Sequence, residues 1–157
     1  MSTVINGTNG EITPLATFTG TTSNLGISLI SGIEKVTISA TAATGTINYD
    51  VTTQSNLYYT DNAAANWTIN FRGSSGTSMN TMMAIGDSTT VVHMVTQGGT
   101  AYYNNAVQVD GSSVTPEYQG GTAFSAGNAN SIDVYVYVII KTADATFKVL
   151  ASQTQFT

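Results

Sequence analysis

The 157-residue chain contains no cysteine. This absence excludes a small scaffold held by disulfide bonds, a thiolate metal site and a cysteine nucleophile. Charge is scarce as well, because charged residues make up 8% of the chain, against about 25% in a typical soluble domain. The four cationic residues, Lys35, Arg72, Lys141 and Lys148, form no basic run that could neutralise phosphates. We therefore expect no binding of nucleic acid.

Long apolar runs are also missing. No stretch approaches the roughly 20 apolar residues that cross a bilayer, so we expect no membrane insertion. Residues 1–6 lack the basic and apolar regions of a secretory signal, which predicts a protein made in a cytoplasm that stays there or leaves by lysis.

Hydroxyl and amide side chains take the place of the missing charges. Eight tyrosines, five phenylalanines and many valines and isoleucines nevertheless indicate a packed β-sheet core, and the length suits one ordinary domain. A surface of threonine and asparagine is easier to desolvate than one of lysine and glutamate. Such a surface suits a protein that contacts many copies of itself or of a neighbour.

Alternation of apolar and polar residues is the dominant pattern, and it predicts β-strands. It occurs in residues 36–41, 47–52, 67–72 and 147–151. Two segments, 91–95 and 134–140, are apolar on both faces. They predict central strands that are covered on both sides, by the protein itself or by a partner subunit.

Turn residues separate these segments. Asn6-Gly7, Asn9-Gly10 and Asp110-Gly111 favour tight hairpins, and glycine-rich connections follow at 73–76 and 98–99. Short strands spaced in this way predict an all-β fold, an antiparallel β-sandwich of the jelly-roll kind. The best helix candidate, residues 79–84, is short.

Two parts of the chain differ in pattern. Residues 1–32 are rich in threonine, serine and glycine, with scattered apolar residues such as Ile12, Leu15 and Phe18. They form either two edge strands of the sandwich or an extended N-terminal arm that docks onto a neighbouring subunit or particle, and we favour the arm. Residues 33–157 are expected to form the body of the β-sandwich.

No catalytic, cofactor-binding or metal-binding constellation is present in the sequence. The one histidine, His93, lies in a strongly apolar segment, where a hydrogen-bonded core or interface residue is the expected role. The nine carboxylates are scattered, mostly beside turns, and a hydrolase would need two of them to converge at a groove. A calcium ion near Asp61 or Asp110 is the remaining metal alternative. We predict a protein without enzymatic activity and without a cofactor.

Two tyrosine pairs are the best candidates for binding. Adjacent residues of a strand point to opposite faces, so one residue of Tyr58/Tyr59 and one of Tyr102/Tyr103 could point outward. An outward tyrosine can stack on a sugar ring, while neighbouring amides bind its hydroxyls. The alternative, which we prefer, is that these rings pack between sheets or between subunits. Trp67 is expected to anchor the core.

Several stretches resemble a module of virion structural and tail-fibre-like proteins of marine tailed bacteriophages, especially cyanophages. They include 43–51 (ATGTINYDV), 66–73 (NWTINFRG), 101–107 (AYYNNAV), 110–116 (DGSSVTP) and 150–156 (LASQTQF). The resemblance covers roughly residues 33–157. The resemblance implies no active site.

The resemblance implies a location on the virion and a structural task. The expected function is a self-associating surface component, either a capsid decoration or a short tail or neck appendage, that works by protein–protein assembly. Its expected partners are further copies of itself, in a homotrimer, and other phage virion proteins. The alternative is a receptor-recognition module of the tail-fibre type that binds a glycan of the host cell surface.

Overall fold

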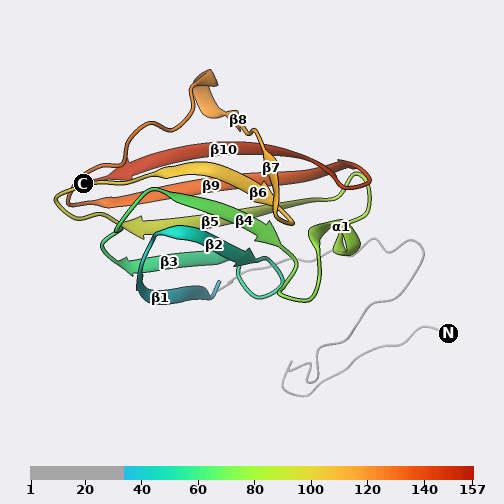
Figure 1. The fold of residues 1–157 in the computed structure, drawn as a ribbon, viewed down its shortest axis with the longest axis horizontal. Helices are drawn as coiled ribbons and strands as arrows, with labels where there is room; N and C mark the ends of the chain where they lie inside the picture. Colours follow the sequence, from blue (N-terminus) through green and yellow to red (C-terminus); the bar gives the residue numbers. More distant parts are fainter. Residues whose placement is uncertain (1–33) are drawn as a thin grey trace, which may run out of the picture. The chain divides into compact units, whose positions relative to one another are not determined.

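The computed structural model describes residues 34–157, and these residues form two stacked β-sheets (Figure 1). The predicted all-β sandwich is confirmed. The compact unit to which these residues belong spans Ile33–Thr157. Ile12, Leu15 and Phe18, with the rest of the expected arm, lie outside the described residues.

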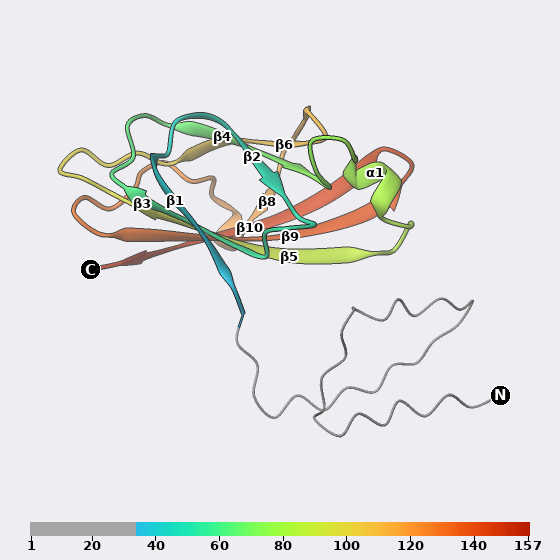
Figure 2. The ribbon, with the colours of Figure 1, turned by 90° about the horizontal axis from the view of Figure 1, so that it is seen from below.

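Each sheet has a defined strand order. The six-stranded sheet contains, in spatial order, β1 (Val36–Ala42), β3 (Asn56–Asp61), β5 (Ser88–Thr96), β9 (Ile132–Ala143), β10 (Thr146–Phe156) and β8 (Glu117–Tyr118). The four-stranded sheet contains β2 (Gly45–Asp50), β4 (Trp67–Arg72), β6 (Asn104–Val109) and β7 (Ser112–Val114). Seen from below, the residues of the sandwich form two layers, with β2, β4 and β6 in one and β1, β3, β5, β9 and β10 in the other (Figure 2).

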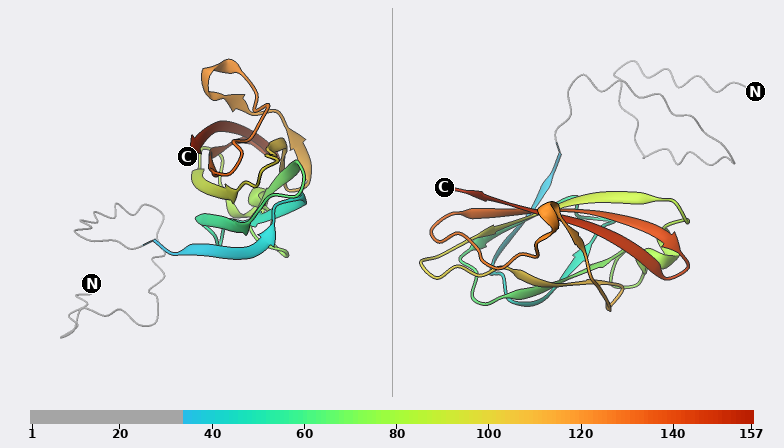
Figure 3. Two further views of the ribbon diagram at one scale, coloured as in Figure 1. Left: turned by 90° about the vertical axis from the view of Figure 1, so that its left-hand side faces the viewer. Right: turned by 90° about the horizontal axis from the view of Figure 1, so that it is seen from above.

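The expectation of an antiparallel sandwich is wrong for much of the structure. Successive strands from β1 to β6 alternate between the two sheets, so the neighbour within a sheet is the strand after next and runs parallel. Antiparallel pairs are formed by β5 with β9, β9 with β10, and β6 with β7. The connections arch from one layer to the other, which the end view in Figure 3 shows.

The core lies between the two sheets and is unusually aromatic. Trp67 and Phe71 of β4 meet Tyr135 and Tyr137 of β9, with ring centroids 5.5 Å apart for Trp67–Tyr135 and 5.0 Å apart for Phe71–Tyr137. All four rings are fully buried, so Trp67 has the predicted role of a core anchor. Tilted and edge-on contacts of this kind add to the free energy gained from burial.

The hairpin and the helix predicted from the sequence are present. Asp110 and Gly111 both have positive φ values, 51° and 78°, and connect β6 to β7 as the Asp-Gly pair predicts. The helix α1 (Met79–Met82) is one turn long. The carboxylate of Asp110 accepts hydrogen bonds from the backbone N–H groups of Met79 and Asn80, so the hairpin also holds the first turn of this helix.

Candidate interaction surface

The most distinctive surface of the described residues is the outer face of the six-stranded sheet, the face turned away from the four-stranded sheet. Apolar side chains from five neighbouring strands gather on it, and we call this surface the outer face. Its apolar members are Val36, Ile38, Tyr58, Val92, Met94, Ile132, Val134, Val136, Val138, Ile140, Leu150 and Phe156.

Strand register places these side chains in continuous rows. One row across the sheet contains Ile38, Tyr58, Met94 and Val134, and the next contains Val36, Asn56, Val92 and Val136. A third row contains Thr90, Val138 and Leu150. Residues directly opposite each other on paired strands are in contact distance. The rows therefore form one apolar surface, not a set of isolated residues.

The edges of the outer face are its most exposed parts. Ile38 keeps 59% of its surface exposed and Leu150 keeps 41%, although both carry large apolar side chains. The valines between them are half-buried, because they shield one another. Contiguous apolar surface of this kind on a soluble protein marks an interaction site more often than a scatter of single apolar residues does.

The outer face carries almost no charge. Its charged side chains are Glu34, which precedes β1 and accepts a hydrogen bond from Asn56 Nδ2 at 2.7 Å, and the pair Lys148 on β10 and Glu117 on β8. Lys148 and Glu117 form an ion pair of 2.9 Å at the opposite edge, and their charges cancel. The face therefore carries one uncompensated charge, the carboxylate of Glu34 at its β1 edge.

The opposite surface of the sandwich has a different character. On the four-stranded sheet the outward positions carry hydroxyl, amide and ionic groups, including Thr68, Asn48 and Asn70. The amide of Asn70 donates to Asn48 Oδ1 at 2.8 Å and its own carbonyl oxygen accepts from the backbone N–H of Gly111. This sheet therefore presents a polar surface with its hydrogen bonds arranged, whereas the outer face presents apolar side chains.

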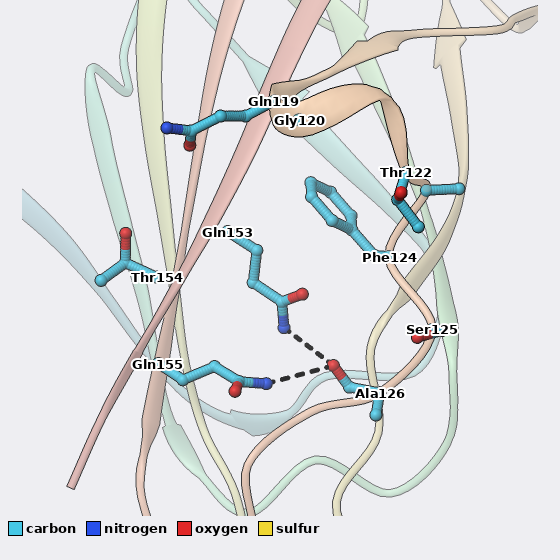
Figure 4. A pocket seen from close by; sticks show the side chains of 10 residues that line it. Gln119, Gly120, Thr122, Phe124, Ser125, Ala126, Gln153, Thr154 and Gln155 are labelled. Atoms are coloured by element: carbon cyan, nitrogen blue, oxygen red, sulfur yellow. Dashed lines mark hydrogen bonds between the residues drawn. The ribbon is translucent and has the colours of Figure 1, made fainter.

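Two hollows border β10. A groove of about 320 Å³ lies on the outer face, with Val136, Val138 and Leu150 among its lining residues. A second, polar hollow of about 790 Å³ lies between the end of β10 and the segment that follows β8 (Figure 4). We call it the glutamine hollow, since Gln119, Gln153 and Gln155 line it.

Side chains of the glutamine hollow are held in place. The amides of Gln153 and Gln155 both donate to the carbonyl oxygen of Ala126, at 3.0 Å and 3.3 Å (Figure 4). Phe124 packs edge-on against Tyr135, with ring centroids 5.3 Å apart. No charged residue is among the lining residues, so the hollow offers hydroxyls, amides and one aromatic ring.

His93 is a core residue and is not accessible to a substrate. It is fully buried, and the rings of Tyr59, Trp67 and Tyr135 lie around it with centroids 5.5 Å to 6.2 Å away. Within residues 34–157 neither ring nitrogen has a hydrogen-bond partner, so the expected hydrogen bond is absent. Burial lowers the pKa of His93 to about 3, and the ring is neutral at pH 7.

The carboxylates act singly and in structural roles. Asp50 pairs with Arg72, Asp110 holds the start of α1, and Asp87 accepts from the backbone N–H of Ala84. Asp133 is fully buried and accepts from Gln97 Nε2 and from the backbone of Asn128, while burial raises its pKa. In the described residues no group of three metal-ligating side chains occurs, and the calcium suggested near Asp61 or Asp110 gains no support.

The structure separates the four tyrosines that the sequence singled out. Tyr58 lies on the outer face, and its hydroxyl is 3.1 Å from that of Thr96. Tyr59 points inward against His93, where burial raises its pKa. Tyr102 and Tyr103 lie half-buried in the connection from β5 to β6, and Tyr102 packs against the core. The expectation that one member of a pair faces outward is met by Tyr58.

Sequence reasoning missed the glutamine hollow and the full extent of the outer face. Gln153 and Gln155, two positions apart, indicated one polar face of a strand. Gln119 lines the same hollow but comes from a distant segment, so local sequence could not predict that the three residues meet. For the outer face, the two-sided apolar segments 91–95 and 134–140 were the correct signal. They form β5 and β9, the two central strands of the six-stranded sheet.

Comparison with known proteins adds no relative. No family model, no curated protein and no solved structure matches the chain. Among residues 34–157, no helix has the length and apolar character needed to span a membrane.

Proposed function

We propose that this chain is a structural protein of a bacteriophage virion, a self-associating surface component that acts by protein–protein assembly. The observation that carries the proposal is the outer face, an apolar and nearly uncharged surface on a protein otherwise covered by hydroxyl and amide groups. The virion setting is supported by the sequence resemblance over residues 33–157. Capsid decoration and a short tail or neck appendage are the two locations that fit.

A structural task also agrees with the chemistry of the described residues. His93 is enclosed by aromatic rings, and Asp50, Asp87 and Asp110 are engaged in separate structural contacts. A hydrolase would need two carboxylates, or a histidine beside a nucleophile, in an accessible groove. These four groups instead hold helix α1, the turns and the core.

The location on the virion can be measured directly. Quantitative mass spectrometry of purified virions would give the copy number of this chain relative to the major capsid protein. A count in the hundreds would indicate capsid decoration, and a few to a few dozen copies would indicate the tail or the neck. If the chain is absent from purified virions, the proposal is refuted. A phage replication protein serves as the negative control in the same measurement.

The proposed docking role of residues 1–32 has its own test. A chain without residues 1–30 should fold, as judged by circular dichroism, but should no longer be incorporated into virions. Incorporation at the normal copy number would refute the docking role and leave the virion proposal intact.

A second candidate function is binding of a neutral glycan of the host cell surface, and the glutamine hollow favours it. Amides fixed by Ala126 and an aromatic ring, without a charged residue, suit the hydroxyls and the apolar face of a sugar. The substitution Gln155→Ala should then weaken adsorption of phage to host cells. The matched substitution Gln108→Ala, on the polar sheet, should leave adsorption unchanged. If phages with the native chain, with Gln155→Ala and with Gln108→Ala adsorb equally, glycan binding at this hollow is refuted.

A further inference from the structure

We infer that the outer face is the surface through which two copies of this chain bind each other, face to face about a two-fold axis. The inference deepens the proposed structural function and rests on it for its purpose. It names the occupant of the outer face as the same face of a second copy. Area, charge and strand order each support this occupant.

The area of the outer face suits a stable pair. Five strands spaced about 4.8 Å apart, with a mean length of about 30 Å, cover roughly 700 Å². A standard protein–protein interface buries roughly 800 Å² on each partner. The whole face, including its exposed edge residues Ile38 and Leu150, therefore provides about the surface that one such partner requires.

The charge of the outer face suits an identical partner. The chain carries a formal net charge of −5, so two copies repel each other through most of their surfaces. The outer face is an exception, because Lys148 and Glu117 neutralise each other at one edge and Glu34 at the β1 edge is its one uncompensated charge. In a two-fold interface the same patch meets itself, and a patch with one charge at its margin does so with little repulsion between like charges.

The strand order of the outer face suits a two-fold pairing across its width. β1 and β10 lie toward opposite edges of the sheet, with β3, β5 and β9 between them. A two-fold axis that runs along the strands therefore places β1 of one copy over the β10 side of the other. The protruding Ile38 then faces the side of the sheet that holds the groove lined by Val136 and Leu150, and both copies make the same contact.

Short side chains favour two copies over three. Paired sheets pack about 10 Å apart, a distance that valine side chains from both faces can bridge. Three such faces around a three-fold axis enclose a wider central space, which side chains as short as those of Val92, Val134 and Val136 do not fill. The outer face thus favours a dimer over the homotrimer that the sequence resemblance suggested.

The test is the mass of the purified full-length chain in solution, measured by sedimentation equilibrium over a range of concentrations and by native mass spectrometry. The substitution Val136→Lys places a charge in the middle of the outer face and should raise the dimer dissociation constant by about tenfold or more. The matched control is Thr68→Lys, because Thr68 is also half-buried and also points outward from a central strand, on the polar sheet. It should leave the dissociation constant unchanged.

A second variant protects the test against loss of folding. The double substitution Val92→Thr, Val136→Thr keeps the β-branched shape and should also weaken the dimer, while circular dichroism verifies the fold. A dimer that is weakened by both outer-face variants and not by the control supports the inference. A monomer, a trimer, or a dimer that the folded outer-face variants leave intact would overturn it. These outcomes are independent of the copy-number measurement, since a monomer in solution can still be found in virions.

Discussion

Acid should destabilise this protein through the burial of His93. The ring lies fully buried among Tyr59, Trp67 and Tyr135, and no described acidic side chain is hydrogen-bonded to it. A positive charge at this position would lose its hydration without gaining a partner. The folded protein therefore resists protonation of His93, whereas the unfolded chain does not.

The sign and the size follow from the two pKa values. The pKa of His93 is about 3 in the folded protein, against 6.5 for an ordinary histidine. At a pH above the ordinary pKa of 6.5, the ring is neutral in both the folded and the unfolded chain. The free energy of unfolding then decreases as the pH falls from 6.5 toward 3. Between pH 7 and pH 4 the loss from this one residue amounts to about 3 kcal/mol.

Asp133 opposes this effect and must be separated from it. Burial raises the pKa of its carboxyl, so the folded protein takes up a proton there more readily than the unfolded chain. The contribution of Asp133 to stability is therefore present at low pH and is lost as the pH rises through its folded pKa. Asp133 therefore reduces the loss of stability in acid that His93 causes.

The substitution His93→Phe isolates that contribution, because phenylalanine fits an aromatic environment and does not titrate. Urea unfolding of both proteins at pH 7, 6, 5 and 4 gives the free energy of unfolding at each pH. The native protein should lose about 3 kcal/mol more than the variant between pH 7 and pH 4. If the two free energies fall in parallel, the reasoning about His93 is refuted.

Two further predictions concern buried contacts at the two ends of the sandwich. The buried ammonium of Lys141 donates to the backbone carbonyl of Asn80 in α1 and to that of Met83, which follows α1, so Lys141→Met should lower the free energy of unfolding by about 1–3 kcal/mol in urea titrations. The exposed Lys148→Met is the control, and an equal effect of both substitutions would contradict a special role for Lys141. A Cβ atom on Gly127 would collide with the backbone carbonyl oxygen of Tyr102 and would lie 2.7 Å from Asp133 Oδ2, so Gly127→Ala should cost about 1–3 kcal/mol by overpacking. Gly76→Ala, which has nothing within 4 Å of its Cβ position, should change the melting temperature little, and equal melting temperatures of the two variants would refute the overpacking argument.

Local pattern predicted the strands of this fold well and their partners poorly. Alternation located β2 and β4, and the Asp-Gly pair located the β6–β7 hairpin. Alternation is a property of one strand, however, and it says nothing about whether the next strand turns back beside it or crosses to the other sheet. The crossing of β1 to β6 between sheets, and hence the parallel pairing, is decided by arches whose residues resemble those of ordinary loops.

The same reasoning explains what was seen and missed in the candidate site. Segments 91–95 and 134–140 were apolar on both faces, and this correctly predicted two central strands. In β1 the apolar residues Val36 and Ile38 lie on the outer face and not toward the core, because the pairing with β3 aligns them with Asn56 and Tyr58. His93 was predicted as a core residue, but its lack of hydrogen bonds depends on the rings that surround it.

The crossing of strands between the sheets has a consequence for how the chain is made. Strands β1 to β6 pair with neighbours two strands along, so each of these pairings spans an intervening strand of the other sheet. The longest local pairing is the β9–β10 hairpin, and β5 needs β9 as its partner. We therefore expect folding to wait until β9 and β10 have left the ribosome, with contacts distant in sequence making it slow. Until then, the valines of β5 are exposed in a chain that has few charges to keep it apart from its copies.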